Sequence, residues 1–181
     1  MELPLNQIID GDCLKILKTF PDKSVDLIIT DPPYGMNFQS NHRGKKHDKI
    51  VNDDQFPLWI FDEFNRIARN GVYIFCRWDN LKDFPKPKSV LAWVKNNWSM
   101  GDLQHEHGRQ WEAICFYPQE GHKFVERIPD VIYANRTGNN LHPTEKPVDL
   151  LERIIYANEG GGNTRPVCRE WKYSYCGRQS R

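Results

Sequence analysis

The chain has 181 residues, of which 39% are hydrophobic and 27% are charged, which suits a single folded domain of ordinary size. Its formal net charge of +1 excludes binding through overall basicity, so any surface for nucleic acid must be local. Five cysteines without C-x-x-C spacing exclude a disulfide framework. The start of the chain has no signal-peptide pattern and no apolar segment reaches membrane-spanning length, so we expect a cytoplasmic protein without a membrane partner.

The first elements that the sequence predicts are a strand, a helix and a second strand. A short strand is expected at 7–10, then a helix that carries Leu14 to Phe20 and ends at Pro21, then a buried strand over 25–29. Asp12 precedes the helix, where the roles of an N-cap and of a functional side chain both stay open.

Four residues end the second strand: Asp31, Pro32, Pro33 and Tyr34. The two prolines stop the strand and hold the backbone rigid without N–H donors. Ligands bind at the carboxyl ends of strands in open α/β sheets. An acid and an aromatic ring at this position therefore indicate a chemical role as well as a turn.

A long polar segment follows from Gly35 to about Asp54, and segments of this length are usually functional or mobile. It contains a basic patch from His42 to Lys49, which either meets phosphates or is a solvated loop. A helix is then expected from Phe56 through Ala68, stopped by Asn70-Gly71, before a buried strand at 72–76.

In the middle of the chain, prolines within 84–88 precede an apolar run at 90–94, and another strand is expected over 111–117. Between them, His105-Glu106-His107 differs in spacing from H-E-x-x-H and has no further ligand cluster, so no metal site is expected. Cys76 and Cys115 lie inside apolar runs and are expected to be small buried hydrophobic residues.

The last informative unit reads L-H-P-T-E-K-P at 141–147 and opens a helix with apolar residues on one side. Pro147 suits the first turn of that helix. Thr144 and Lys146 beside a helix N-terminus favour an anionic group. Beyond three glycines at 160–162, no apolar period is found, so the tail is expected to contribute little to the core.

The 31–34 motif suits a reaction at the exocyclic amine of a base, whose lone pair is delocalised into the ring. The Asp31 carboxylate and a backbone carbonyl of the turn would each accept one N–H, and both hydrogen bonds would strengthen as positive charge develops. Tyr34 offers a ring on which an extruded base would stack, with about 1–3 kcal/mol to gain.

In these features the sequence resembles the DNA amino-methyltransferases, which transfer methyl from S-adenosylmethionine to adenine N6 or cytosine N4. Their D/N/S-P-P-Y/F/W tetrapeptide stands at 31–34, and H-P-T-E-K-P follows in the order of members whose catalytic half precedes the cofactor half. Similarity also lies at 9–13, 24–30, 71–78 and 111–114. The resemblance covers roughly residues 5 to 160 and implies a Rossmann-like α/β sheet with helices on both faces.

Three sets of site residues are expected, and no metal. The catalytic set is Asp31, Pro32, Pro33 and Tyr34. The set at S-adenosylmethionine is Asp12, Cys13, Asp31, His142, Thr144 and Lys146. The set at nucleic acid is His42, Arg43, Lys45, Lys46 and Lys49. The implied partner is double-stranded DNA with a flipped base, as in restriction-modification systems, and the aspartate form of the tetrapeptide favours adenine over cytosine.

The chain departs from the family after the glycine run, where members continue into a strand and a D-P-F-x-G-S-G loop around the cofactor. Residues 163–172 read N-T-R-P-V-C-R-E-W-K instead. One codon choice for 165–173 spells D-P-F-V-G-S-G-N in the next frame, and the Trp171-Lys172 junction forces a glycine there. We therefore hypothesise a frameshifted or truncated end: a partial catalytic domain at 1–160, a poorly ordered non-family tail at 161–181, a sheet incomplete at its cofactor strand, and impaired activity.

Two other hypotheses stay open. A non-catalytic remnant that binds nucleic acid would show no S-adenosylmethionine binding by calorimetry. Methylation of an amide nitrogen in an RNA-associated protein uses related tetrapeptides, although the basic segment and the H-P-T-E-K-P unit suit DNA better.

Overall fold

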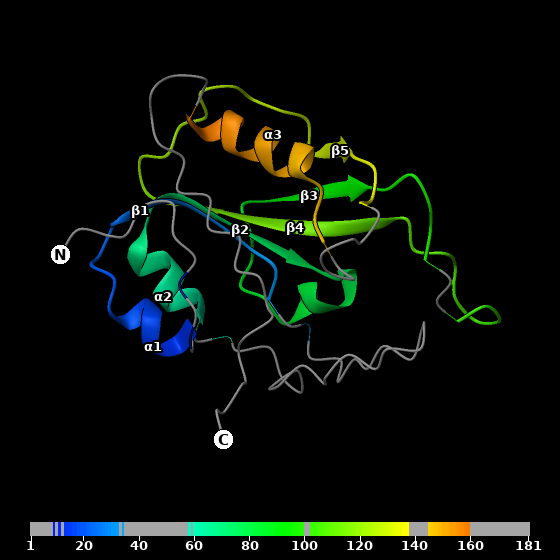
Figure 1. Cartoon of the computed structure of the whole chain (residues 1–181), viewed down its shortest axis with the longest axis horizontal. Helices are drawn as coiled ribbons and strands as arrows, with labels where there is room; N and C mark the ends of the chain where they lie inside the picture. Colours follow the sequence, from blue (N-terminus) through cyan, green and yellow to red (C-terminus); the bar gives the residue numbers. More distant parts are fainter. Residues whose placement is uncertain are drawn as a thin grey trace.

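A mixed sheet of five strands lies between two layers of helices in the computed structural model, which describes residues 9, 11, 13–32, 34, 58, 60–99, 102–137 and 145–159 (Figure 1). The elements are α1 (Cys13–Lys18), β1 (Val25–Thr30), α2 (Ile60–Ile67), β2 (Ala68–Cys76), the 3-10 helix η1 (Trp78–Lys82), β3 (Ser89–Val94), β4 (Trp111–Pro118), β5 (Val131–Tyr133) and α3 (Val148–Glu159). α1 and α2 lie on one side of the sheet and α3 on the other, so the expected helices on both faces are confirmed.

The strand order β1-β2-β4-β3-β5 combines parallel and antiparallel pairs. β1 pairs in parallel with β2, and β3 pairs in parallel with β5. β4 lies between β2 and β3 and is antiparallel to both. Four strands therefore end at the same edge of the sheet, and β4 begins there.

Alternation of side chains along the strands produces two hydrophobic cores. In β2, Val72 and Ile74 join the core under α1 and α2, whereas Tyr73 and Phe75 face the other way into the core under α3. The buried face of α2 consists of Ile60, Phe61, Phe64 and Ile67. Each such side chain contributes about 1.5–3 kcal/mol when it is fully removed from water.

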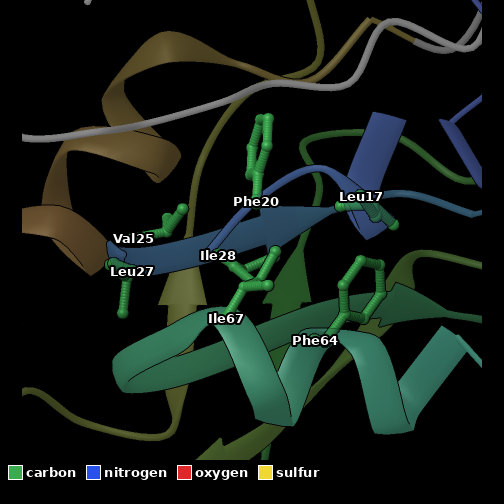
Figure 2. A pocket seen from close by; sticks show the side chains of 7 residues that line it. All are labelled: Leu17, Phe20, Val25, Leu27, Ile28, Phe64 and Ile67. Carbon is green, nitrogen blue, oxygen red and sulfur yellow. The ribbon is translucent and has the colours of Figure 1, made fainter. Parts of the chain in front are cut away.

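A small cavity of about 10 Å³ lies where α1, α2 and β1 meet (Figure 2). Only apolar side chains line it: Leu17, Phe20, Val25, Leu27, Ile28, Phe64 and Ile67. A buried water molecule needs polar partners, and this lining offers none. The cavity is a gap in core packing and carries no features of a binding site.

The structure confirms most of the expected elements that fall on described residues, and the boundary that differs most is the one between α2 and β2. The helix was expected to run through Ala68 and to stop at Asn70-Gly71, but α2 ends at Ile67 and β2 starts at Ala68. Ala68 is held in the sheet because it pairs with Val25, and Arg69 next to it binds Asp26 at 2.8 Å. Tertiary pairing thus overrides the local helix pattern.

One strand was not expected, the expected burial of two cysteines is confirmed, and three expected segments are largely not described. β5 was not expected, because three residues are too few for an alternating pattern to stand out. Both Cys76 and Cys115 are fully buried, as expected. The expected strand at 7–10 is described only at Ile9, and both the 35–54 segment and the tail at 161–181 lie outside the described residues.

Gly71 provides a test of the packing between β2 and β4. An added Cβ would lie 2.8 Å from Phe116 Cε2 and 3.3 Å from the Tyr117 carbonyl oxygen. Phe116 cannot withdraw easily, because its ring stacks on Tyr73 with a centroid distance of 4.4 Å. We expect Gly71→Ala to lower the free energy of unfolding by about 1–3 kcal/mol in urea titrations.

The matched control is Glu120→Ala in the exposed turn after β4, which should change stability by less than about 0.5 kcal/mol. Equal stability of the Gly71→Ala variant and the parent chain would contradict the packing described for Phe116.

Candidate active site

Charged side chains gather at the edge where β1, β2 and β3 end and β4 begins. Asp31 follows β1 directly, Lys95 follows β3, and Glu112 is the second residue of β4. Lys146 comes from the short segment before α3. The order and the directions of the strands bring the ends of β1 and β3 to the edge at which β4 begins. Residues far apart in sequence therefore meet at this edge.

Asp31 is held from two sides. Its Oδ2 accepts from Lys146 Nζ at 2.9 Å, and its Oδ1 accepts from the Tyr34 hydroxyl. The turn is anchored in addition by Asn80 of η1, whose Nδ2 donates to the Tyr34 carbonyl oxygen at 3.1 Å. The carboxylate therefore has a defined orientation at the end of β1.

Lys146 is the most buried cation of this edge, with 7% of its side chain exposed. Besides Asp31, its Nζ contacts Glu112 Oε2 at 3.1 Å. It also lies 5.1 Å from the ring centre of Phe75 and 5.8 Å from that of Trp93. Burial alone would lower the pKa of Lys146, but the two carboxylates outweigh it and raise the pKa above its ordinary value.

Glu112 joins two lysines. Its Oε2 binds Lys146, and its Oε1 binds Lys95. Burial opposes ionisation of this carboxyl group, yet the two cations overcome it and hold the pKa below its usual range. Lys95 shows the opposite balance, because burial lowers its pKa despite the contact with Glu112.

Tyr34 keeps its proton. Burial, and next the negative charge of Asp31, raise the pKa of the Tyr34 hydroxyl well above its ordinary value. The hydroxyl therefore stays protonated well above neutral pH and remains a donor to Asp31 there. The sequence predicted a stacking surface in Tyr34; the structure adds this hydrogen bond.

Several predicted site residues meet here and others are not described. Asp31, Tyr34 and Lys146 lie together; Pro32 lies in the turn and half-buried Cys13 begins α1. The remaining ones fall outside the described residues: Asp12, Pro33, His42, Arg43, Lys45, Lys46, Lys49, His142 and Thr144. The sequence predicted that Thr144 and Lys146 favour an anionic group. For Lys146, the anionic groups that the structure shows are the carboxylates of Asp31 and Glu112 in the chain itself.

Sequence reasoning missed Glu112, Lys95 and Asn80 as members of the site. A charged residue at the start of an apolar strand was the available signal for Glu112.

His105 contacts Asp102 at 3.0 Å, and among described residues no group of three or more metal-ligating side chains is found. No described helix is long and apolar enough to cross a bilayer.

Removing the Lys146 charge should be costly, because it leaves two neighbouring carboxylates without their shared cation. We expect Lys146→Met to lower the free energy of unfolding by about 3–5 kcal/mol at pH 7. The folded chain raises the pKa of Lys146, so its stabilisation is complete below the unfolded pKa of about 10.4 and is lost as pH rises through the folded pKa.

Urea unfolding of both proteins between pH 7 and pH 11 measures this difference, which should shrink above about pH 10.4. Lys86→Met, at an exposed position, is the matched control and should leave stability unchanged. A Lys146→Met penalty that stays constant up to the highest pH would show that packing, and not charge, is what the substitution removes.

Two curated relatives resemble the chain in sequence. The chain is 49% identical over 206 aligned positions to the type II methyltransferase M.BglII of Bacillus subtilis, covering 82% of this chain and 55% of that protein. It is 26% identical over 147 positions to the DNA adenine methyltransferase YhdJ of Escherichia coli K12, covering 73% of this chain and 47% of that protein. The chain thus spans about half the length of these relatives. No family model matches it.

A solved structure, that of the M1.HpyAVI-SAM complex, shares the fold with a TM-score of 0.59. It is 22% identical to the chain, and the match covers 84% of this chain and 76% of that one. The likeness confirms the Rossmann-like α/β sheet that the sequence predicts.

Proposed function

We propose that the chain is a DNA amino-methyltransferase, which transfers a methyl group from S-adenosylmethionine to the exocyclic amine of adenine (N6) or cytosine (N4) in DNA. The observation that carries this proposal is the Asp31 carboxylate, held at the end of β1 by Lys146 and by the Tyr34 hydroxyl. The name of the relative YhdJ favours adenine as the target.

Asp31 suits the role of hydrogen-bond acceptor for the target amine. Each carboxylate oxygen has two lone-pair positions, and each has one described partner, so each has room for one N–H of the substrate. The adjacent Lys146 ammonium group binds Oδ2 of Asp31 and fixes the direction in which the carboxylate presents its acceptor oxygens. The hydrogen bond strengthens as the amine nitrogen becomes positive.

The described residues are compatible with the cofactor. Bound S-adenosylmethionine supplies an electrophilic methyl group on a cationic sulfur, for which Asp31 offers a nearby negative charge. Lys146 has three N–H donors, and two of them are matched by described carboxylates, so among the described residues the third is left for the cofactor. We assign Asp12, Cys13, His142 and Thr144 to the same cofactor by their place in the family motifs.

The substrate that we propose is double-stranded DNA with the target base turned out of the helix. Tyr34 would stack on the base, and the basic patch of 42–49 would contact phosphates, as in restriction-modification systems acting in the cytoplasm. Residues 1–160 would form the catalytic domain. Residues 163–172 hold no D-P-F-x-G-S-G loop, so we expect weak activity and a rise when this loop is restored in place of 165–173.

The proposal is tested by Asp31→Asn, which keeps the shape of the side chain and removes its charge. Transfer of radioactive methyl from S-adenosylmethionine to duplex DNA should fall by at least about 100-fold, as when an oriented electrostatic partner is lost. Asp83→Asn, at an exposed position next to η1, should transfer methyl at the parent rate.

Calorimetry with S-adenosylmethionine separates this proposal from a non-catalytic remnant, which the missing glycine loop favours. If neither the 181-residue chain nor the loop-restored chain binds the cofactor or methylates DNA, the enzymatic proposal is wrong. Parallel assays on DNA and on protein distinguish methylation of a base from methylation of an amide.

Tyr34 has two separable roles in this proposal, since its ring would stack and its hydroxyl positions Asp31. Tyr34→Phe removes the hydroxyl alone, and we expect kcat to fall about tenfold while the KM for DNA is retained. Tyr34→Ala should also weaken DNA binding, by about 1–3 kcal/mol of lost stacking. Steady-state kinetics with binding measured by fluorescence anisotropy checks both; identical behaviour of the two variants would refute the separation.

A further inference from the structure

Five side chains form what we call the edge cluster: Asp31, Tyr34, Lys95, Glu112 and Lys146. Within it, contacts run from Asp31 to Lys146, from Lys146 to Glu112 and from Glu112 to Lys95. Charges alternate along this path, and two carboxylates balance two ammonium groups. Glu112 makes no described hydrogen bond to Asp31, and Lys146 is the described residue that binds both carboxylates.

Because the edge cluster is buried, its equal number of carboxylates and ammonium groups affects its stability. Lys146 and Lys95 expose 7% and 10% of their side chains, and Glu112 exposes 21%. Removing one member of a buried ion pair leaves an uncompensated charge, which is strongly unfavourable. Without Glu112, Lys95 would lose its described carboxylate partner, and Lys146 would keep Asp31 alone among the described carboxylates.

We propose that Glu112 is a positioning residue for methyl transfer: it holds Lys146 so that Asp31 is oriented by one N–H and keeps its negative charge available to the target amine. This inference rests on the function proposed above. It assigns to β4 a part in the reaction although β4 lies two positions from β1 in the sheet.

The electrostatic reason concerns the charge that develops during the reaction. The target nitrogen becomes positive as it takes the methyl group, and a nearby cation opposes this change. Glu112, 3.1 Å from Lys146 Nζ, offsets that cation, so Asp31 is oriented without its charge being cancelled. Both Glu112 oxygens are bound by lysines and the carboxyl stays ionised, so Glu112 is not itself a base.

The groups around Lys146 show which of them can neutralise its charge. Lys146 binds Asp31 after β1 and Glu112 of β4, and its charge also acts on Lys95, which follows β3. Tyr34 enters through its hydrogen bond to Asp31. The Cys76 thiol of β2 also senses Asp31 and Glu112, and Arg136 after β5 senses Lys95. The aromatic faces of Phe75 and Trp93 complete the site. Among these described groups, Asp31 and Glu112 are the anions in contact with Lys146.

The test compares the Glu112→Gln variant with two further variants of this chain. Glu63→Gln is the matched control, because Glu63 is also ion-paired, with Arg66 at 2.8 Å, but lies on α2. The double variant Glu112→Gln, Lys95→Met removes one anion and one cation, so it restores the charge balance of the cluster without restoring Glu112.

Two readouts keep the inference separate from the proposed function. The first is the titration of the Lys146 side chain by NMR with labelled lysine, its signal assigned by its loss in Lys146→Met. In Glu112→Gln the titration midpoint should fall by at least about one pH unit, the double variant should recover most of it, and Glu63→Gln should not differ from the parent.

The second readout is methyl transfer, measured as kcat and KM over a range of pH in the parent and loop-restored chains. We expect Glu112→Gln to lose about 100-fold in kcat through misplacement of Asp31, with KM for DNA unchanged, and the double variant to regain part of kcat. The alkaline limit of kcat should move down with the Lys146 midpoint.

An unchanged Lys146 titration in Glu112→Gln overturns the inference, as does a rise in KM at constant kcat or a double variant whose losses simply add. Absence of methyl transfer from the parent and loop-restored chains contradicts the proposed function instead, while the lysine titration still decides whether Glu112 controls Lys146.

Discussion

The contact between Lys146 and Asp31 joins the start of α3 to the end of β1. α3 packs on one face of the sheet through Leu150 and Ile154, which are fully buried, and the segment before it returns to the edge with the ammonium group. Burial makes this placement costly unless both neighbouring carboxylates are present. The contact between Lys146 and Asp31 thus links the placement of α3 to the pairing of charges at this edge of the sheet.

The single reversed strand of the sheet makes this arrangement possible. In a purely parallel sheet each strand would present its carboxyl end at this edge, whereas β4 presents its first residues there. Glu112 therefore lies in the regular part of a strand, where backbone pairing with Trp93 restricts its position. Trp93 is held in turn by its indole N–H, which donates to the Ala134 carbonyl oxygen at 2.8 Å. The lysines consequently meet a rigid carboxylate rather than one on a loop.

The sequence predicted those features that depend on local pattern. The buried strand at 25–29, the strand at 111–117 and the helix after Pro147 have enough apolar periodicity to be recognised without tertiary information. Asp31 was also placed correctly at the end of a strand, because a strand followed by two prolines in the sequence has few alternative structures.

The other features depend on contacts between distant residues. The boundary at Ala68 is set by pairing with Val25 across the sheet, and no local rule anticipates it. The Lys146 contacts follow from the order of strands, so the sequence could assign its preference for an anion but not the partners. Glu112 has an ordinary strand environment in the sequence, and only the topology brings two lysines to it.

The direct passage from α2 into β2 has a consequence for how this chain tolerates change in length. Ile67 ends the helix and Ala68 already pairs in the sheet, so no linker separates the two elements. One residue inserted at this junction would rotate α2 by about 100° relative to the sheet, which would turn Phe64 and Ile67 away from the core. An inserted residue should therefore be tolerated poorly at this junction and better in the exposed turn after β4.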